Sequence, residues 1–103
     1  MISFPVFLVA KETSKGAEWV RVQLNEQPHL ATFSTSDKAT AFADSLPKDQ
    51  HDDQYVIREF SAEPELSREL VGPPTVLFCV IDYVPGKGTQ RAVRADLLLR
   101  YLR

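Results

Sequence analysis

The residues best placed for chemistry lie in one segment, PGKGTQR, residues 85–91. A glycine turn exposes backbone amides, and Lys87 and Arg91 add positive charge beside Gly88 and Thr89, so this segment can bind an anion or a phosphate group. It lacks the preceding glycine at the spacing that a nucleotide-binding P-loop needs. An ordinary glycine turn in which Thr89 caps the following helix explains the same residues.

Asp82 is the second candidate, because it ends a strongly apolar strand predicted over residues 75–81, and Tyr83 follows it. A carboxylate at the end of a central strand could act as a general acid or bind a metal. No histidine or second carboxylate is tied to it by the sequence, and an aspartate that caps a loop accounts for it equally well. The two interpretations stay open.

The remaining polar clusters predict no metal site, no cofactor and no catalytic residue. His51 lies among three aspartates, yet their spacing matches neither a calcium-binding EF-hand loop nor paired zinc ligands. His29 stands alone at the start of a strand, which favours a structural role. Serine, histidine and aspartate occur without the GxSxG signature of a nucleophile.

Composition excludes several classes of protein. The 103 residues are 44% hydrophobic and carry a formal net charge of −2, so no overall field attracts nucleic acid or an anionic membrane. Arginines at positions 91, 94, 100 and 103 would spread around the last helix without interleaved aromatic residues, and we expect no nucleic-acid partner. No run approaches the 18 or so apolar residues of a membrane span, and the start of the chain lacks the features of a signal peptide. We therefore expect no membrane association and a cytoplasmic location. Cys79 lies in an apolar run, which predicts a buried thiol.

Three strands are predicted before the first helix. Residues 4–10 are apolar on both faces, and Pro5 predicts either an edge position or a late start for that strand. Residues 19–24 alternate strictly, with Trp19 on the more polar face, and residues 29–33 supply a third strand. Short turns between them favour an antiparallel meander.

A helix should follow directly. Ser34 and Asp37 match a capping box, and Ala39, Phe42 and Leu46 recur on one face before Pro47.

The second half of the chain predicts two more strands and two more helices. Residues 55–60 form a strand, which a right-handed crossover could place beside a parallel neighbour. Residues 61–71 form a short helix, and residues from Thr89 onward form the last helix. Residues 75–81 form a central strand in which Phe78 and Val80, or Leu77 and Ile81 on the opposite face, should be nearly inaccessible, so that Phe78→Ala should cost about 3 to 5 kcal/mol. We therefore expect a single α+β domain over residues 1–103, a mixed five-stranded sheet in the order βββαβαβα with three helices packed on it.

This order, together with Phe33, Ser34 and Thr35 after a strand and Ala39 and Phe42 in the next helix, resembles the SseB-like amino-terminal domain, a small bacterial module. The segments SRELV at residues 67–71 and VIDYVPGKG at 80–88 lie roughly where that family has a short helix and a strand-to-loop element. The resemblance implies an accessory role associated with bacterial secretion. It carries over no catalytic residue.

We expect the chain to function through a binding surface. Its apolar residues are used in the sheet and helices, and the sequence shows no cluster of catalytic residue types. The first hypothesis is a non-enzymatic protein-interaction module. The alternative is a small ligand- or anion-binding protein, or an enzyme, that uses the pocket at the end of strand 75–82 and the Gly86 to Gly88 turn, with Lys87, Gly88, Thr89, Arg91 and Asp82. A subunit of a larger bacterial assembly is a third.

A homodimer is also expected. Successive crossovers in one direction would put the first two helices on one face of the sheet, so that the cover would fall short near Trp19 and Tyr55. A two-fold dimer or a partner protein would bury that patch.

Overall fold

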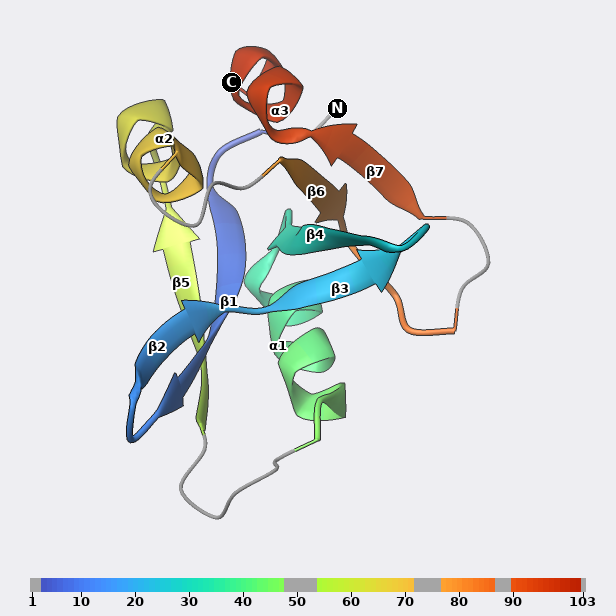
Figure 1. Ribbon diagram of the computed structural model, residues 1–103. Coiled ribbons are helices and arrows are strands. Elements are labelled where there is room, and N and C mark those ends of the chain that lie inside the picture. The colour runs from blue at the N-terminus through green and yellow to red at the C-terminus, as the bar shows by residue number, and fades with distance from the viewer. Residues whose placement is uncertain (1–2, 48–53, 72–76, 87–89, 103) are drawn as a thin grey trace.

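A mixed sheet of seven strands forms the centre of the described part of the chain, with three helices packed on it, so the protein is a single α+β domain (Figure 1). The computed structural model describes residues 3–47, 54–71, 77–86 and 90–102. The elements in order are β1 Val6–Thr13, β2 Gly16–Trp19, β3 Arg21–Leu24, β4 Gln27–Phe33, α1 Ser36–Ser45, β5 Gln54–Phe60, α2 Glu63–Val71, β6 Phe78–Ile81, β7 Arg91–Arg94 and α3 Ala95–Tyr101. The fold class is confirmed, and the expected number of five strands is too low.

The first strand lies inside the sheet. β5 occupies one edge of β1, and β2 and β4 share the other, all three antiparallel to it. The strand begins at Val6, directly after Pro5, so the late start is correct and the edge position is wrong. An interior strand must be covered on both faces, which explains why residues 6–10 are apolar and buried without alternation.

The predicted strand over residues 19–24 is two strands, because the chain changes partner at Val20. The Val20 N–H donates to the Val9 carbonyl at 2.8 Å, and the Val20 carbonyl accepts from the Ala31 N–H at 3.3 Å. β2 therefore pairs with β1, and β3 pairs with β4. The alternation that predicted one strand continues through this corner, so the sequence gives no sign of it.

The helix after β4 begins one residue later than predicted. Thr35 is the N-cap, and its hydroxyl accepts from the Lys38 N–H at 3.2 Å. Ser34 is therefore not the cap, and the predicted Ser34–Asp37 box is wrong. Ala39 and Phe42 are buried as expected. Three hydroxyl residues in succession offer alternative caps, and the bond between Ser34 and Asp82 described below leaves Thr35 to serve.

The helices cover the two faces of the sheet unequally. α1 packs on one face, while α2 and α3 lie together on the other (Figure 1). Both β5 and β6 run parallel to β4, with β1 between β4 and β5. The crossover from β4 to β5 and the one from β5 back to β6 thus run in opposite directions, and crossovers of one hand then put their helices on opposite faces. The expectation that the first two helices share a face is wrong, as is a parallel strand directly beside β5.

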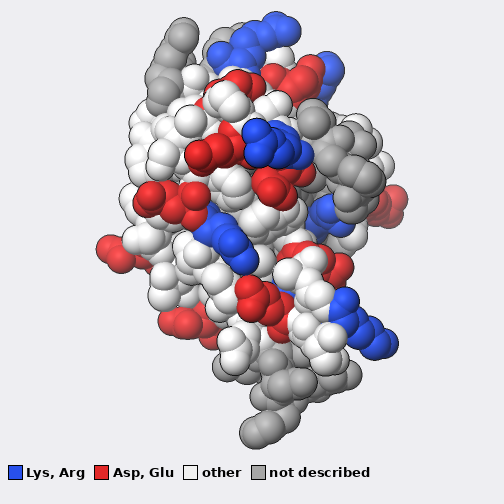
Figure 2. Space-filling model, turned by 90° about the vertical axis from the view of Figure 1, so that its left-hand side faces the viewer, with Lys and Arg blue, Asp and Glu red and all other residues white. Residues whose placement is uncertain are grey.

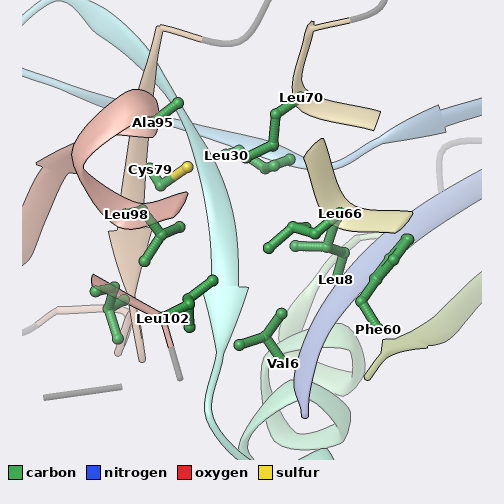
Figure 3. Packing of buried hydrophobic residues seen from close by; sticks show 11 residues of the cluster. Val6, Leu8, Leu30, Phe60, Leu66, Leu70, Cys79, Ala95, Leu98 and Leu102 are labelled. Carbon is green, nitrogen blue, oxygen red and sulfur yellow. The ribbon is translucent and has the colours of Figure 1, made fainter. Parts of the chain in front are cut away.

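Two separate hydrophobic clusters lie on the two faces of the sheet, and successive residues of β1 contribute to them in alternation. The cluster under α2 and α3 is shown in Figure 3, and its members are Val6, Leu8, Leu30, Phe60, Leu66, Leu70, Cys79, Ile81, Ala95, Leu98 and Leu102. The cluster under α1 consists of Phe7, Val9, Ala31, Phe33, Ala39 and Phe42. The short helix α2 thus contributes Leu66 and Leu70, as its spacing predicted.

Two predictions about the last third of the chain need correction. Val80 and Ile81 are buried as predicted, whereas Leu77 is 66% exposed and Phe78 is half-buried. The buried part of the strand is therefore shorter than predicted. Residues 91–94 form β7, antiparallel to β6, so the last helix begins at Ala95 and not at Thr89. Val93 pairs with Cys79, so these residues extend the sheet where a helix was expected.

The turn between β3 and β4 contains a residue in an unfavourable backbone conformation, and its effect on stability can be tested. Asn25 and Glu26 form a two-residue loop with φ of 52° and 65°, a conformation that Asn and Gly adopt readily and Glu does not. We expect Glu26→Gly to raise the free energy of unfolding by about 1 kcal/mol, measured by urea denaturation. Glu26→Ala is the matched control, because alanine removes the same side chain but keeps the strain. An equal gain in both variants would show that the side chain, not the backbone, is responsible.

Candidate functional site

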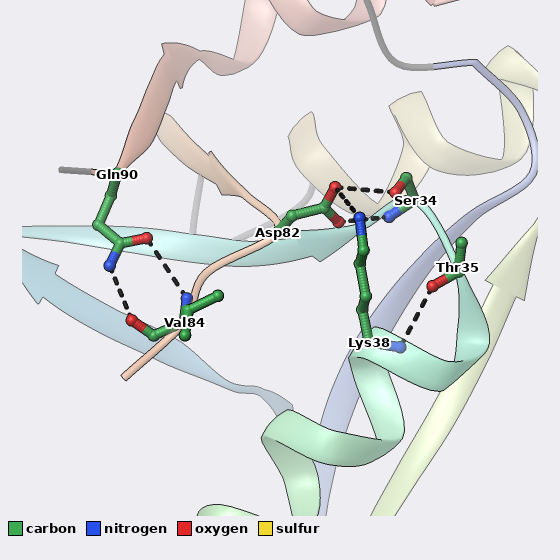
Figure 4. Close-up of polar contacts among 6 residues, drawn as sticks. All are labelled: Ser34, Thr35, Lys38, Asp82, Val84 and Gln90. Carbon is green, nitrogen blue, oxygen red and sulfur yellow. Dashed lines mark hydrogen bonds and ion pairs between the residues drawn. The ribbon is translucent and has the colours of Figure 1, made fainter. Parts of the chain in front are cut away.

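Asp82 lies where β6 ends, and it ties this end of the sheet to the start of α1 (Figure 4). One carboxylate oxygen accepts from the Ser34 backbone N–H at 2.8 Å. The other accepts from the Ser34 hydroxyl at 2.8 Å and from the Lys38 ammonium group at 3.2 Å. The Asp82 N–H donates to the Thr32 carbonyl at 2.8 Å, and φ of Asp82 is 54°. Aspartate tolerates this left-handed conformation better than most residues.

These contacts favour the ionised form of Asp82. Partial burial raises the pKa of the carboxyl, but the hydrogen bonds from Ser34 and the charge of Lys38 outweigh burial, and the net pKa lies below its ordinary value. A general acid at neutral pH needs a raised pKa, so this aspartate is unsuited to that role. Both of its oxygens are occupied by the protein itself. Asp82 therefore acts as a clamp between β6 and α1.

Beside this clamp lies an open hollow of about 410 Å³, called here the Asp82 hollow and lined by Lys38, Phe42, Asp82, Tyr83, Gln90 and Arg91, among others. Asp82 and Arg91, which the sequence predicts to share a pocket at the end of this strand, both line the hollow. The rings of Phe42 and Tyr83 meet edge to face at 5.7 Å. The Gln90 side-chain amide holds the backbone of Val84 through bonds of 3.3 and 2.8 Å (Figure 4).

Most polar groups around the Asp82 hollow therefore serve the fold. Arg91 is exposed and has no ion-pair partner among the residues that the structure describes. Lys87, Gly88 and Thr89, the other members of the predicted anion site, lie outside the described residues. Among the described residues around this hollow, one guanidinium beside two aromatic rings is available to a ligand.

A second candidate surface lies on the α2 face of the sheet, where β2, β1 and β5 extend beyond the helices. It is a groove of about 550 Å³, called here the Trp19 groove and lined by Ala10, Ala17, Trp19, Arg58, Phe60 and Glu69, among others. The half-buried indole of Trp19 meets the ring of Phe60 edge to face at 5.9 Å, and its Nε1–H donates to a carboxylate oxygen of Glu69 at 3.2 Å. Two independent contacts thus hold the indole in one orientation.

The predicted interface residues do not form a single patch on one face. Trp19 pairs with Ala10, and Tyr55 pairs with Lys11, the next residue of β1. Successive side chains of a strand point to opposite faces, so Trp19 lies on the α2 face and Tyr55 on the α1 face. Tyr55 packs beside the cluster under α1, and its hydroxyl donates to the Pro47 carbonyl at 2.6 Å. Both residues border a hollow of about 280 Å³ at the end of the sheet.

With this geometry in place, comparison with known proteins adds no assignment. No protein-family model matches the chain. A search of curated proteins also found no match. Arguments about function therefore depend on the surfaces described above.

The remaining titratable candidates are accounted for by the fold. Burial raises the pKa of the Cys79 thiol to about 11, although the Thr32 hydroxyl lowers it in part, so the thiol is not a nucleophile at neutral pH. His29 is buried, stacks on Phe78 at 5.3 Å and lies 2.9 Å from the Gln27 carbonyl, which fits a structural role. Within the described ranges no group of three His, Cys, Asp or Glu side chains is placed to hold a metal ion. His51 falls outside those ranges.

Among the described residues, no helix is long and apolar enough to cross a membrane.

Sequence reasoning missed the partners that make the two surfaces. Ser34 was assigned to a cap, and its bond to Asp82 joins residues 48 apart. Glu69 and Phe60 were not predicted as neighbours of Trp19, because they lie far from it along the chain. Glu69 is 50 residues from Trp19. Contacts between residues so far apart produce no recognisable pattern of spacing in the sequence. The position of Trp19 on the more polar face of its strand was the one available signal.

Proposed function

We propose that this chain is a non-enzymatic protein-interaction module whose partner binds in the Trp19 groove. The observation that carries the proposal is an aromatic side chain that is half-exposed yet held by Phe60 and Glu69. Tryptophan is among the residues most often found at the energetic centre of interfaces, and an anchor that is already ordered loses little entropy on binding.

The chemistry of the groove defines the kind of partner. Its floor is apolar, with Ala10 and Ala17 beside Trp19, and its rim carries both signs of charge, with Arg21 and Arg58 near Glu18, Glu59 and Glu69. The side of the molecule that carries β5 and α2 shows the same mixture of acidic and basic side chains (Figure 2). Such a surface favours a protein segment with an apolar anchor and polar flanks over nucleic acid or an anionic membrane.

The resemblance to the SseB-like domain supports the same proposal, since that family is associated with accessory proteins rather than with catalysis. On this proposal the chain acts in the cytoplasm of a bacterium. The alternative, binding of a small anion or ligand in the Asp82 hollow, is supported by the exposed Arg91 beside Phe42 and Tyr83. The contacts of Asp82 argue against a general acid there, because they hold the pKa of its carboxyl below the ordinary value.

The test is quantitative capture of partners from a lysate of the source organism, followed by affinity measurement with the purified partner. Trp19→Ala removes the anchor, and Ala17→Glu adds a charge to the groove at an exposed position. We expect either variant to weaken binding at least about tenfold. Arg91→Glu is the matched control at the Asp82 hollow and should bind as the unchanged protein does. Thermal unfolding confirms that each variant is folded.

Loss of binding in Arg91→Glu with retention in both groove variants would contradict the proposal and favour the alternative site.

A further inference from the structure

The outer edge of β5 carries backbone groups that have no partner among the residues that the structure describes. The Val9 carbonyl bonds to Val20, on the edge of β1 away from β5, so the alternate residues Leu8 and Ala10 direct their N–H and C=O groups toward β5. Their partners Arg58 and Val56 are thereby satisfied. The residues between and beside them in β5, which point outward, are Tyr55, Ile57 and Glu59. No partner for their backbone groups lies among the described residues.

The side chains along this edge do little to protect it. Proteins commonly guard an exposed edge with proline, a bulge or charges along its length. β5 pairs with β1 over all seven of its residues without interruption, and its charges, Arg58 and Glu59, are confined to one half. Its other half presents Tyr55, Val56 and Ile57, which are half-buried and rich in strand propensity. A long regular edge of this composition favours pairing with another strand.

We propose that β5 of a second copy of this chain pairs with this edge, antiparallel and across a two-fold axis at Ile57. Only this register uses all the outward groups at once. Ile57 pairs with Ile57 of the second copy, and Tyr55 pairs with Glu59 in both directions, so each of three pairs exchanges two hydrogen bonds.

Charge and shape in this register suit a second copy. Arg58 faces Val56 of the second copy, and Glu59 faces Tyr55, so no like charges lie opposite each other. The β-branched side chains of the two Ile57 residues meet on the α1 face. An unrelated strand would meet the same groups without this self-complementarity. The two copies carry mixed surface charge on this side, which opposes their approach little (Figure 2).

The dimer also bears on the Trp19 groove. Arg58 and Phe60 belong both to β5 and to that groove, so pairing through β5 sets the two grooves beside the same two-fold axis. This inference goes beyond the proposed function, because an isolated chain can still bind a partner through Trp19. The variants that test the two are different.

Sedimentation equilibrium of the full chain at about 50 μM tests the proposal. We expect the unchanged protein to be a dimer, and Ile57→Lys, which sets two like charges against each other on the axis, to weaken the dimer at least about tenfold. Ala92→Lys makes the same kind of change on β7, at the opposite edge of the sheet, and should leave the dimer unchanged. A monomeric unchanged protein, or a dimer equally strong in Ile57→Lys, would overturn the proposal.

A second measurement guards against a misfolded lysine variant. Ile57→Cys places two thiols together at the axis, and a short thiol-reactive crosslinker should then join two chains. Ala92→Cys should give no crosslinked dimer, and the buried Cys79 should not react in the folded protein. Absence of the crosslink in Ile57→Cys would reject the two-fold at this residue.

Discussion

Truncation of Phe33 to alanine should lower the free energy of unfolding by about 4 kcal/mol. The side chain of Phe33 is fully buried at the end of β4. Its ring centroid lies 5.2 Å from that of Phe42, a residue of α1. Removing the ring leaves a cavity between the sheet and the helix that neither can readily fill. The effect is measured as the shift in a urea or guanidinium denaturation curve at constant slope.

Phe78→Ala is the matched control for this prediction. Phe78 is half-buried and stacks on His29 at 5.3 Å, so truncation should cost only roughly 1.5 kcal/mol. The sequence predicted Phe78 to be nearly inaccessible, and on that prediction its truncation would have cost as much as that of Phe33. Equal losses in the two variants would mean that Phe78 is buried more deeply than described.

Asp82→Ala should lower the free energy of unfolding by about 3 kcal/mol, the second-largest effect expected. The change removes the acceptor of the Ser34 N–H, of the Ser34 hydroxyl and of the Lys38 ion pair. Alanine also tolerates the left-handed backbone at this position less well than aspartate does. Because the contacts join β6 to the start of α1, their loss should loosen α1 in particular.

Asp82→Asn separates charge from backbone conformation. Asparagine tolerates the left-handed conformation and keeps one side-chain acceptor, but it loses the ion pair with Lys38, so a loss of roughly half that of alanine is expected. A variant as destabilised as Asp82→Ala would show that the charge contributes nearly all of the effect.

The pH dependence gives an independent measurement. The folded-state pKa of Asp82 lies below its value in the unfolded chain, so the carboxylate stabilises the fold fully above the unfolded pKa. That stability is lost as the pH falls through the folded pKa. The difference in unfolding free energy between the unchanged protein and Asp82→Asn should stay constant above about pH 5 and shrink below about pH 4. A constant difference down to about pH 2 would contradict the assigned contacts.

Local chemistry predicted most of the elements but not their pairing. The burial of Ala39 and Phe42 and of Leu66 and Leu70 follows from helical spacing, and β1 follows from its apolar run. The corner at Val20 depends on hydrogen bonds to two different strands, which alternation cannot reveal. The sequence predicts a helix where β7 lies, because a segment this short fits both the helical and the strand period. Pairing with the neighbouring β6 determines that it is a strand.

The candidate sites show the same division. The sequence selected Asp82 and Arg91 and indicated Trp19 on a polar face, and the structure places the first two around one hollow. It could not show that Ser34 and Lys38 lower the pKa of Asp82, because the pKa of a carboxyl depends on neighbours that the fold brings in. The separation of Trp19 and Tyr55 depends on register, since a shift of one residue would put them on the same face.

The alternation along β1 has a consequence for how the protein comes apart. Val6 and Leu8 support α2 and α3, whereas Phe7 and Val9 support α1, so one short stretch of backbone belongs to both clusters. Neither cluster can open fully without displacing the strand that the other needs. The two halves should therefore behave as a single cooperative unit, in which the amide protons of β1 and β4 exchange with solvent only through opening of the whole domain.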